Sequence, residues 1–146
     1  MFKHILLPTD GSESSEKVIK SGIKFAQETG AKVTGFFAAP DFPPMLYAEW
    51  GAELLAQQDY DEMTKTQTRE YLAVIEKEAK AAGVPCECFS ISSNSPYTAI
   101  IKAAEDKKCD LIFMASHGRK GIAAVLLGSE TIRVLTHSKI PVLVYR

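Results

Sequence analysis

Short apolar runs alternate with longer amphipathic stretches along the whole chain, and this alternation restricts the fold more than any other feature. Runs at residues 5–7, 33–39, 111–114 and 141–145 have the length of strands, and a more polar run at 86–91 is typical of a sheet edge. Apolar residues between these runs recur at helical spacing. Strand–helix alternation of this kind favours one parallel sheet with helices on both faces, joined by right-handed crossovers.

Capping residues predict where the helices begin and end. Ser12 is expected to cap the first helix, and Gly30 is expected to end it. A charged, mostly helical segment runs from about residue 50 to residue 82. The last two helices are expected to open at Ser95-Pro96, with serine as the cap and proline in the first turn, and at Ser129 as a second cap.

Length, charge and cysteine content narrow the classes of protein. The 146 residues are enough for one domain, 1–146, with a sizeable core. A formal net charge of −1 predicts no attraction to nucleic acid or to an anionic membrane surface. The chain has no apolar stretch of membrane-spanning length, and its first residues lack the apolar region of a signal peptide, so none is expected. Cys86 and Cys88 are too close for an ordinary disulfide. A cytoplasmic location is therefore expected.

The loops after the first and fourth strands are the expected place for a ligand. In an open parallel sheet, ligands bind beyond the carboxyl ends of the strands, where the winding direction reverses. If the first strand is central, residues 10–12 and 115–121 flank that crevice, and both loops contain small residues. The helix opening at Gly128-Ser129 would add free amides that favour phosphate, and the hydroxyls of Ser129 and Thr131 would add donors.

Several stretches resemble a known family, whereas familiar phosphate-loop and zinc-protease motifs are absent. Together, in order and spacing, the stretches resemble the universal stress proteins over essentially the whole chain. The resemblance implies an α/β fold with a single doubly wound five-stranded parallel sheet in the order 3-2-1-4-5. It also implies binding of ATP, or of AMP or ADP. The stretches are Pro8-Thr9-Asp10-Gly11-Ser12, Met114-Ala115-Ser116-His117-Gly118, Gly128-Ser129 and Pro141-Val142-Leu143-Val144.

Nucleotide-binding members of that family carry a loop of the form G-x-x-G-x9-G-[ST]. Ala115, Gly118, Gly128 and Ser129 match its spacing, with alanine in place of the first glycine. The added methyl group costs little if the backbone angles at this position suit alanine, but it would crowd a sugar or phosphate held against the chain.

The resemblance also implies a role for each site residue. Glu130 departs from the usually uncharged family position, so its charge would weaken a triphosphate unless Arg119 or a metal such as Mg²⁺ offsets it. His117 matches a residue common in the family. Asp10 would form a hydrogen bond with the adenine or the ribose, beside Pro8 and Thr9, and the backbone of Ala38 would contact the adenine edge. Met114 and Ala115 would approach the ribose. The phosphates would be held by Gly118, Gly128, Ser129 and the amide of Glu130.

Structural interpretations stay open beside these functional ones. Asp10 would serve equally to cap the first turn, and Gly118 to supply a positive φ in a loop. Arg119 is more often a solvated loop charge than a phosphate ligand, and a loop histidine such as His117 is more often structural than catalytic. Cys109, before a buried strand, is expected to be a small core residue.

Two further functions remain as alternatives to a nucleotide-binding regulatory module. One is a family member that binds no nucleotide and acts through protein contacts, and the other is a slow ATPase. No general base or nucleophile pair stands out beside the loop, so no catalytic residue is predicted. A homodimer is also expected, since the resemblance implies antiparallel pairing of the edge strand Val142, Leu143, Val144 and Tyr145 about a two-fold axis.

Overall fold

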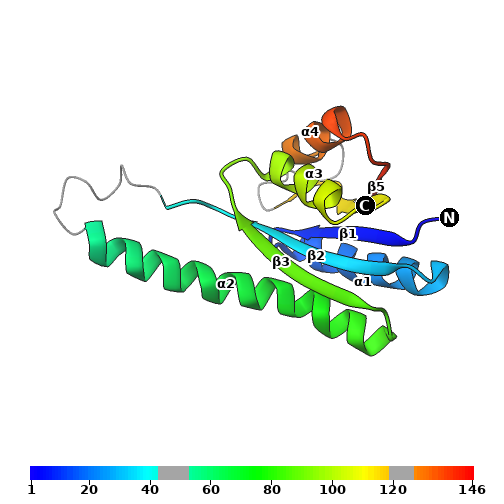
Figure 1. The fold of residues 1–146 in the computed structure, drawn as a ribbon, viewed down its shortest axis with the longest axis horizontal. Coiled ribbons are helices and arrows are strands. Elements are labelled where there is room, and N and C mark those ends of the chain that lie inside the picture. The colour runs from blue at the N-terminus through cyan, green and yellow to red at the C-terminus, as the bar shows by residue number, and fades with distance from the viewer. Residues whose placement is uncertain (43–52, 119–126) are drawn as a thin grey trace.

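The computed structural model describes residues 1–42, 53–118 and 127–146 (Figure 1). Strands and helices alternate along these residues, as the sequence pattern predicts. The elements are β1 His4–Thr9, α1 Glu13–Thr29, β2 Lys32–Ala39, α2 Glu53–Ala82, β3 Cys86–Ser92, α3 Pro96–Asp106, β4 Leu111–Ala115, α4 Ser129–His137 and β5 Val142–Tyr145.

The strands form one five-stranded sheet in the order β3-β2-β1-β4-β5, which confirms the expected order. All neighbouring strands pair in parallel. The first strand is central, and the chain winds away from it in one direction through β2 and β3 and in the other through β4 and β5. The winding therefore reverses between β1 and β4, where an open sheet leaves a crevice at its carboxyl edge.

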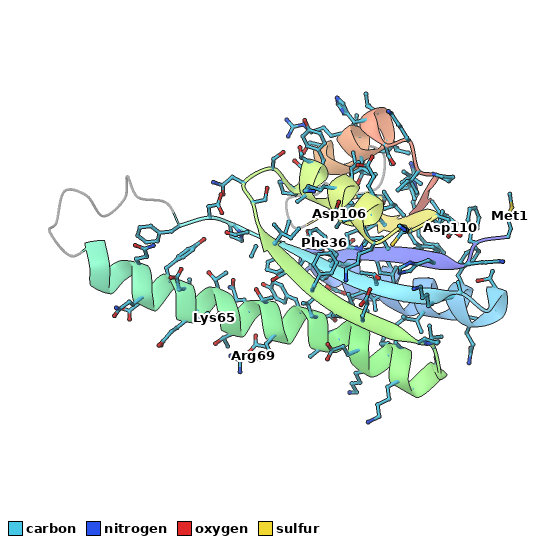
Figure 2. The ribbon with its side chains drawn as sticks, in the orientation of Figure 1. Met1, Phe36, Lys65, Arg69, Asp106 and Asp110 are labelled. Atoms are coloured by element: carbon cyan, nitrogen blue, oxygen red, sulfur yellow. The ribbon has the colours of Figure 1, made fainter. Side chains whose placement is uncertain are left out.

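Helices cover both faces of the sheet (Figure 1). α1 and α2 pack on one face around a core that includes Leu7 and Ile75, whereas α3 and α4 pack on the other around Leu6 and Phe36. Figure 2 shows Phe36 in the interior, where β2 faces α3. Leu6 and Leu7 are both fully buried although they point to opposite faces. A central parallel strand covered on both sides requires such a continuous apolar run.

α1 begins and ends as predicted. The hydroxyl of Ser12 accepts a hydrogen bond from the amide of Ser15 at 3.2 Å. At the other end, Gly30 adopts a left-handed conformation with φ of 70°. Gly22 in the middle of the helix leaves no room for a side chain against Leu7. The glycine thus allows α1 to lie close to the central strand.

The predicted cap position is confirmed for α3 and wrong by one residue for α4. The N-cap of α4 is Gly128, and Ser129 is the first helical residue. Ser95 does hold the N-cap position of α3, but its side chain makes no cap hydrogen bond. Its hydroxyl lies 2.8 Å from the Thr98 hydroxyl instead. The amides at the start of α3 therefore need another acceptor.

α2 is the longest helix, with 30 residues. Figure 1 shows that its first half runs beyond the edge of the sheet, whereas its second half packs beneath β2 and β3. From residue 57 on, where its side chains are described, its buried residues accordingly begin at Leu72 and continue with Ile75 and Ala79. No helix among the described residues combines the length and apolar character that a membrane span requires.

Candidate functional site

A cavity of about 440 Å³ opens at the carboxyl ends of β1, β2 and β4. It therefore lies at the point where the winding of the sheet reverses. Arg119 lies outside the described residues, and every other residue predicted to contact the nucleotide lines this cavity. These lining residues are Pro8, Thr9, Asp10, Ala38, Met114, Ala115, His117, Gly118, Gly128, Ser129, Glu130 and Thr131.

Asp10 organises the turn between β1 and α1. Its Oδ1 accepts hydrogen bonds from the Ser12 amide at 2.9 Å and from the Ser15 hydroxyl at 2.7 Å. The interpretation of Asp10 as a turn residue is thus correct for Oδ1. Its Oδ2 lies next to Gly118 of the loop after β4. One carboxylate therefore fixes the first loop of the site and contacts the second.

Glycine at position 118 is explained by the lack of room for a side chain and not by the backbone conformation. Its φ is not positive, unlike that of Gly11, which has φ of 75° in the first loop. A Cβ atom on Gly118 would overlap the Asp10 carboxylate. The proposal of a positive φ at Gly118 is therefore wrong.

Ala115, in place of the first motif glycine, sits without backbone strain. It is the last residue of β4 and does not have a positive φ. Its backbone angles therefore suit alanine, which was the condition for tolerating the methyl group. The side chain is half-buried at the cavity wall.

His117 connects the second loop to α1. Its Nε2 lies 3.0 Å from the Ser14 hydroxyl, and its Nδ1 lies 3.0 Å from the Ser116 hydroxyl. Both ring nitrogens therefore have protein partners. This arrangement supports a structural role that holds the loop in place.

The start of α4 is tied to the end of β4 by two contacts. The amide of Gly128 donates to the Ser116 carbonyl at 2.7 Å, and a Cβ on Gly128 would lie 3.0 Å from the Cα of His117. The Thr131 hydroxyl donates to the Ala115 carbonyl at 3.0 Å. The Thr131 proton is thus engaged within the protein, whereas Ser129 is exposed in the first turn.

Glu130 is directed toward α3. Its Oε2 accepts a hydrogen bond from the amide of Tyr97 at 2.8 Å, and its Oε1 lies 3.0 Å from a guanidinium nitrogen of Arg133. The carboxylate therefore supplies the acceptor that Ser95 does not provide at the start of α3.

Five lining residues were not singled out from the sequence. Ser15 is buried and bonds Asp10, so it belongs to the polar part of the site. The others form apolar walls, and their periodicity identified them only as core or as a helix start. The five are Ser15, Phe36, Phe37, Pro96 and Ile100. Their positions near the carboxyl end of β2 and near the starts of α1 and α3 place them beside the crevice, and this could have identified them as site residues.

A larger and more open hollow of about 530 Å³ lies between α2 and the ends of β2 and β3. It shares no lining residue with the predicted site, and the α2 residues Lys65 and Arg69 (Figure 2) that line it are exposed. The smaller cavity carries the buried polar groups and the close backbone approaches. We therefore take the smaller cavity as the candidate site.

Metal-binding groups do not gather among the described residues. No three histidine, cysteine, aspartate or glutamate side chains lie close enough there to hold an ion. Cys86 and Cys88 are free thiols with sulfur atoms 3.9 Å apart, and Cys109 is buried, as expected. Burial raises the pKa of the Cys109 thiol to about 11.

The comparison with protein families covers the whole chain. The model of the universal stress protein family matches residues 1–146. The chain belongs to this family. The universal stress protein MJ0531 of Methanocaldococcus jannaschii is 34% identical over 147 residues, which cover 100% of this chain and 83% of that relative. A universal stress protein of Thermus aquaticus is 29% identical over 146 residues, with both chains covered completely.

Solved universal stress protein structures share the fold. The structure of MJ0577 of Methanocaldococcus jannaschii has a TM-score of 0.77 and 29% identity, covering 99% of this chain and 95% of that one. A universal stress protein in complex with cAMP has a TM-score of 0.65 and 26% identity, covering 99% and 97%. An Arabidopsis thaliana family member with AMP bound has a TM-score of 0.69 and 14% identity, which supports the fold alone.

Proposed function

We propose that this universal stress protein binds ATP or a related adenine nucleotide in the cavity at the carboxyl edge of its sheet. In this proposal it acts as a regulatory module of the stress response in the cytoplasm. One observation carries the proposal: the residues that match the family's nucleotide loop line a single cavity of about 440 Å³. That volume falls within the usual range for small-molecule sites.

The lining residues suggest a division of the cavity between base and phosphates. Phe36, Phe37 and Ala38 at the end of β2 offer apolar surface and backbone groups to an adenine ring. Gly128 and Ser129 open α4, whose free amides and dipole favour a phosphate. Asp10 follows β1, which lies between β2 and β4 in the sheet, and would contact the ribose or the adenine.

Relatives with bound nucleotides give independent support. A solved family member at 26% identity is a complex with cAMP, which contains adenine, ribose and one phosphate. Mg²⁺ usually keeps several waters and binds through substrate phosphates. A magnesium ion here would thus depend on the nucleotide, since the described residues provide no cluster of metal-binding groups.

We propose that the protein binds the nucleotide and does not hydrolyse it. The histidine that lines the cavity, His117, has both ring nitrogens bonded to serine hydroxyls. A catalytic base must instead reach the proton that it removes. A slow ATPase would therefore need a base other than His117 in its present position.

Release of bound ligand tests the function directly. Protein purified without added ligand and then denatured should release an adenine nucleotide, or the empty protein should melt at higher temperature when ATP or AMP is added. A ligand at about 100 times its Kd stabilises the folded state by roughly 2.7 kcal/mol. Nucleotide-free protein with an unchanged melting temperature at millimolar ATP and AMP would support a protein that acts through protein contacts alone.

Substitution of Ser129 tests the place of the phosphates. Ser129→Ala should weaken the binding of a phosphorylated nucleotide more than that of adenosine, because the hydroxyl lies at the start of α4. Thr136→Ala, at the other end of the same helix, is the control, since its hydroxyl bonds the Ile132 carbonyl at 2.7 Å. Equal losses for adenosine and nucleotide would remove the role assigned to Ser129.

We further propose a homodimer formed through β5. This strand is at one edge of the sheet. Tyr145 on β5 and Ile132 and Leu135 on the adjacent α4 are large apolar side chains exposed by 42%, 48% and 42%. An exposed edge strand beside apolar surface is commonly paired or covered. Antiparallel pairing of two copies about a two-fold axis would satisfy the edge and cover part of this surface.

A further inference from the structure

The carboxylate of Glu130 lies between the starts of two helices. Glu130 is the second residue of α4, and the amide that it accepts from, at 2.8 Å, belongs to Tyr97, the second residue of α3. Both helices start at the cavity, since Pro96 and Ser129 line it as well. The protein therefore places one of its own negative charges beside two positively polarised helix ends.

The start of α3 has no other side-chain cap. The Ser95 side chain makes no cap hydrogen bond, and Pro96 has no amide hydrogen. The Tyr97 amide would otherwise be free to bind an anion from the cavity. Glu130 fills that position, so of these two described helix starts only that of α4 is left for a nucleotide phosphate.

Glu130 is held in this position through both oxygens. Oε1 lies 3.0 Å from the Arg133 guanidinium, which itself lies over the Tyr97 ring, 5.7 Å from its centroid. Tyr97 and Arg133 thus hold the carboxylate from two helices. A nucleotide that displaced it would break a hydrogen bond to the α3 amide and a contact with Arg133.

The described wall of the cavity is acidic. Asp10 and Glu130 are its two carboxylates, and no lysine or arginine is among the described lining residues. Each further phosphate on a nucleotide would add negative charge beside this wall, where the described guanidinium of Arg133 is already paired with Glu130. Repulsion between like charges at a partly buried site changes affinity by about tenfold or more.

We infer that Glu130 sets the number of phosphates that this site accepts, favouring an adenine nucleotide with one phosphate over the triphosphate. This inference rests on the proposed nucleotide-binding function and adds its ligand class. One phosphate is accommodated by the amides that open α4. The further charges of a triphosphate would need additional amides, and those at the described start of α3 face the carboxylate of Glu130.

Calorimetric titration with AMP and with ATP tests the inference. Wild-type protein should bind AMP about tenfold more tightly than ATP. Glu130→Gln removes the charge and keeps an oxygen that can accept a hydrogen bond from the Tyr97 amide. The affinity for ATP should therefore rise about fivefold or more, and the affinity for AMP should change by less than about twofold. Glu105→Gln is the control, because this exposed acid on α3 is not part of the cavity wall.

Each outcome of these titrations decides between the two proposals. If wild-type protein binds ATP at least as tightly as AMP, or if Glu130→Gln leaves the ratio unchanged, the role of Glu130 is wrong and nucleotide binding stands. If wild-type protein binds neither nucleotide, both proposals are wrong. Glu130→Ala is the second variant: it should also tighten ATP, but it should lower the melting temperature because α3 loses its acceptor.

Discussion

Asp10 and Gly118 lie so close together that a methyl group on Gly118 would overlap the Asp10 carboxylate. Asp10 follows β1 and Gly118 belongs to the loop after β4, so the contact joins the two loops that flank the cavity. The same carboxylate holds the turn into α1 through Ser12 and Ser15. The absence of a side chain at residue 118 therefore determines where Asp10 can lie.

The first prediction concerns this contact. Gly118→Ala should displace Asp10 and weaken adenine-nucleotide binding by about tenfold. Gly83→Ala is the control: nothing lies within 4 Å of a Cβ there, but its φ is 67°, so it should cost roughly 1 kcal/mol of stability without changing affinity. Titration of both variants and urea unfolding distinguish the two effects. Full affinity in Gly118→Ala would show that the close contact has no part in binding.

The second prediction concerns Gly35 of β2 and Cys88 of β3. A Cβ on Gly35 would lie 2.5 Å from the Cys88 sulfur and 2.9 Å from a methyl carbon of Ile75. Gly35→Ala should therefore destabilise the fold by about 2 kcal/mol through overpacking. Adding Cys88→Ala should recover part of that loss, measured by a double-mutant cycle in urea. Strict additivity of the two changes would contradict this packing.

The third prediction concerns the pH dependence of stability. His4 is buried, with its Nε2 2.7 Å from the Thr34 hydroxyl, and burial together with the nearby Lys32 charge lowers its pKa below 6.5. The unfolded chain then binds the proton more tightly than the folded one. The free energy of unfolding should therefore fall as the pH drops below about 6.5 toward the lowered pKa.

Urea unfolding between pH 7.5 and pH 5 measures this effect. His4→Gln should reduce the slope of stability against pH, whatever its effect on stability at pH 7.5. His137→Gln is the control, since His137 is exposed. An unchanged slope in His4→Gln would show that His4 does not contribute to the pH dependence.

The fourth prediction concerns the proposed dimer. The carbonyls of Pro141 and Tyr145 accept hydrogen bonds from Ile112 and Ser116 at 2.9 Å and 3.1 Å. Alternate residues of a parallel strand face the same neighbour, so Leu143 also faces β4, whereas Val144 presents its amide at the open edge. Val144→Pro should therefore convert a dimer to a folded monomer, as measured by sedimentation.

Leu143→Pro is the matched contrast for the dimer. It removes an amide from the ladder between β4 and β5 and should destabilise the fold itself, because proline is tolerated only at free edges. Wild-type protein that sediments as a monomer at micromolar concentration would rule out the dimer. A Val144→Pro protein that remains dimeric would place the interface elsewhere.

Local signals predicted most of the fold. Buried strands such as β4 read as unbroken apolar runs, and the left-handed Gly30 ends α1 where expected. The positions of the site residues followed from topology, because the carboxyl ends of β1 and β4 must meet at one edge. The cavity thus forms where the order of strands predicts it.

The details that the sequence did not predict depend on tertiary contacts. Ser95 has the residue type of a cap, yet the acceptor for the start of α3 is Glu130, from a different helix. Likewise, Gly118 looks like a loop glycine, and only the nearby Asp10 shows why it must lack a side chain. Neither relation is visible in the spacing of residues along the chain.

The bond from Glu130 to the start of α3 also has an evolutionary consequence. In a relative with an uncharged residue at the position of Glu130, the backbone amide at the position of Tyr97 still needs a hydrogen-bond acceptor. The nearest substitute is the residue at the position of Ser95, as an aspartate or asparagine turned toward the helix. Substitutions at these two positions should therefore occur together among descendants of a common ancestor.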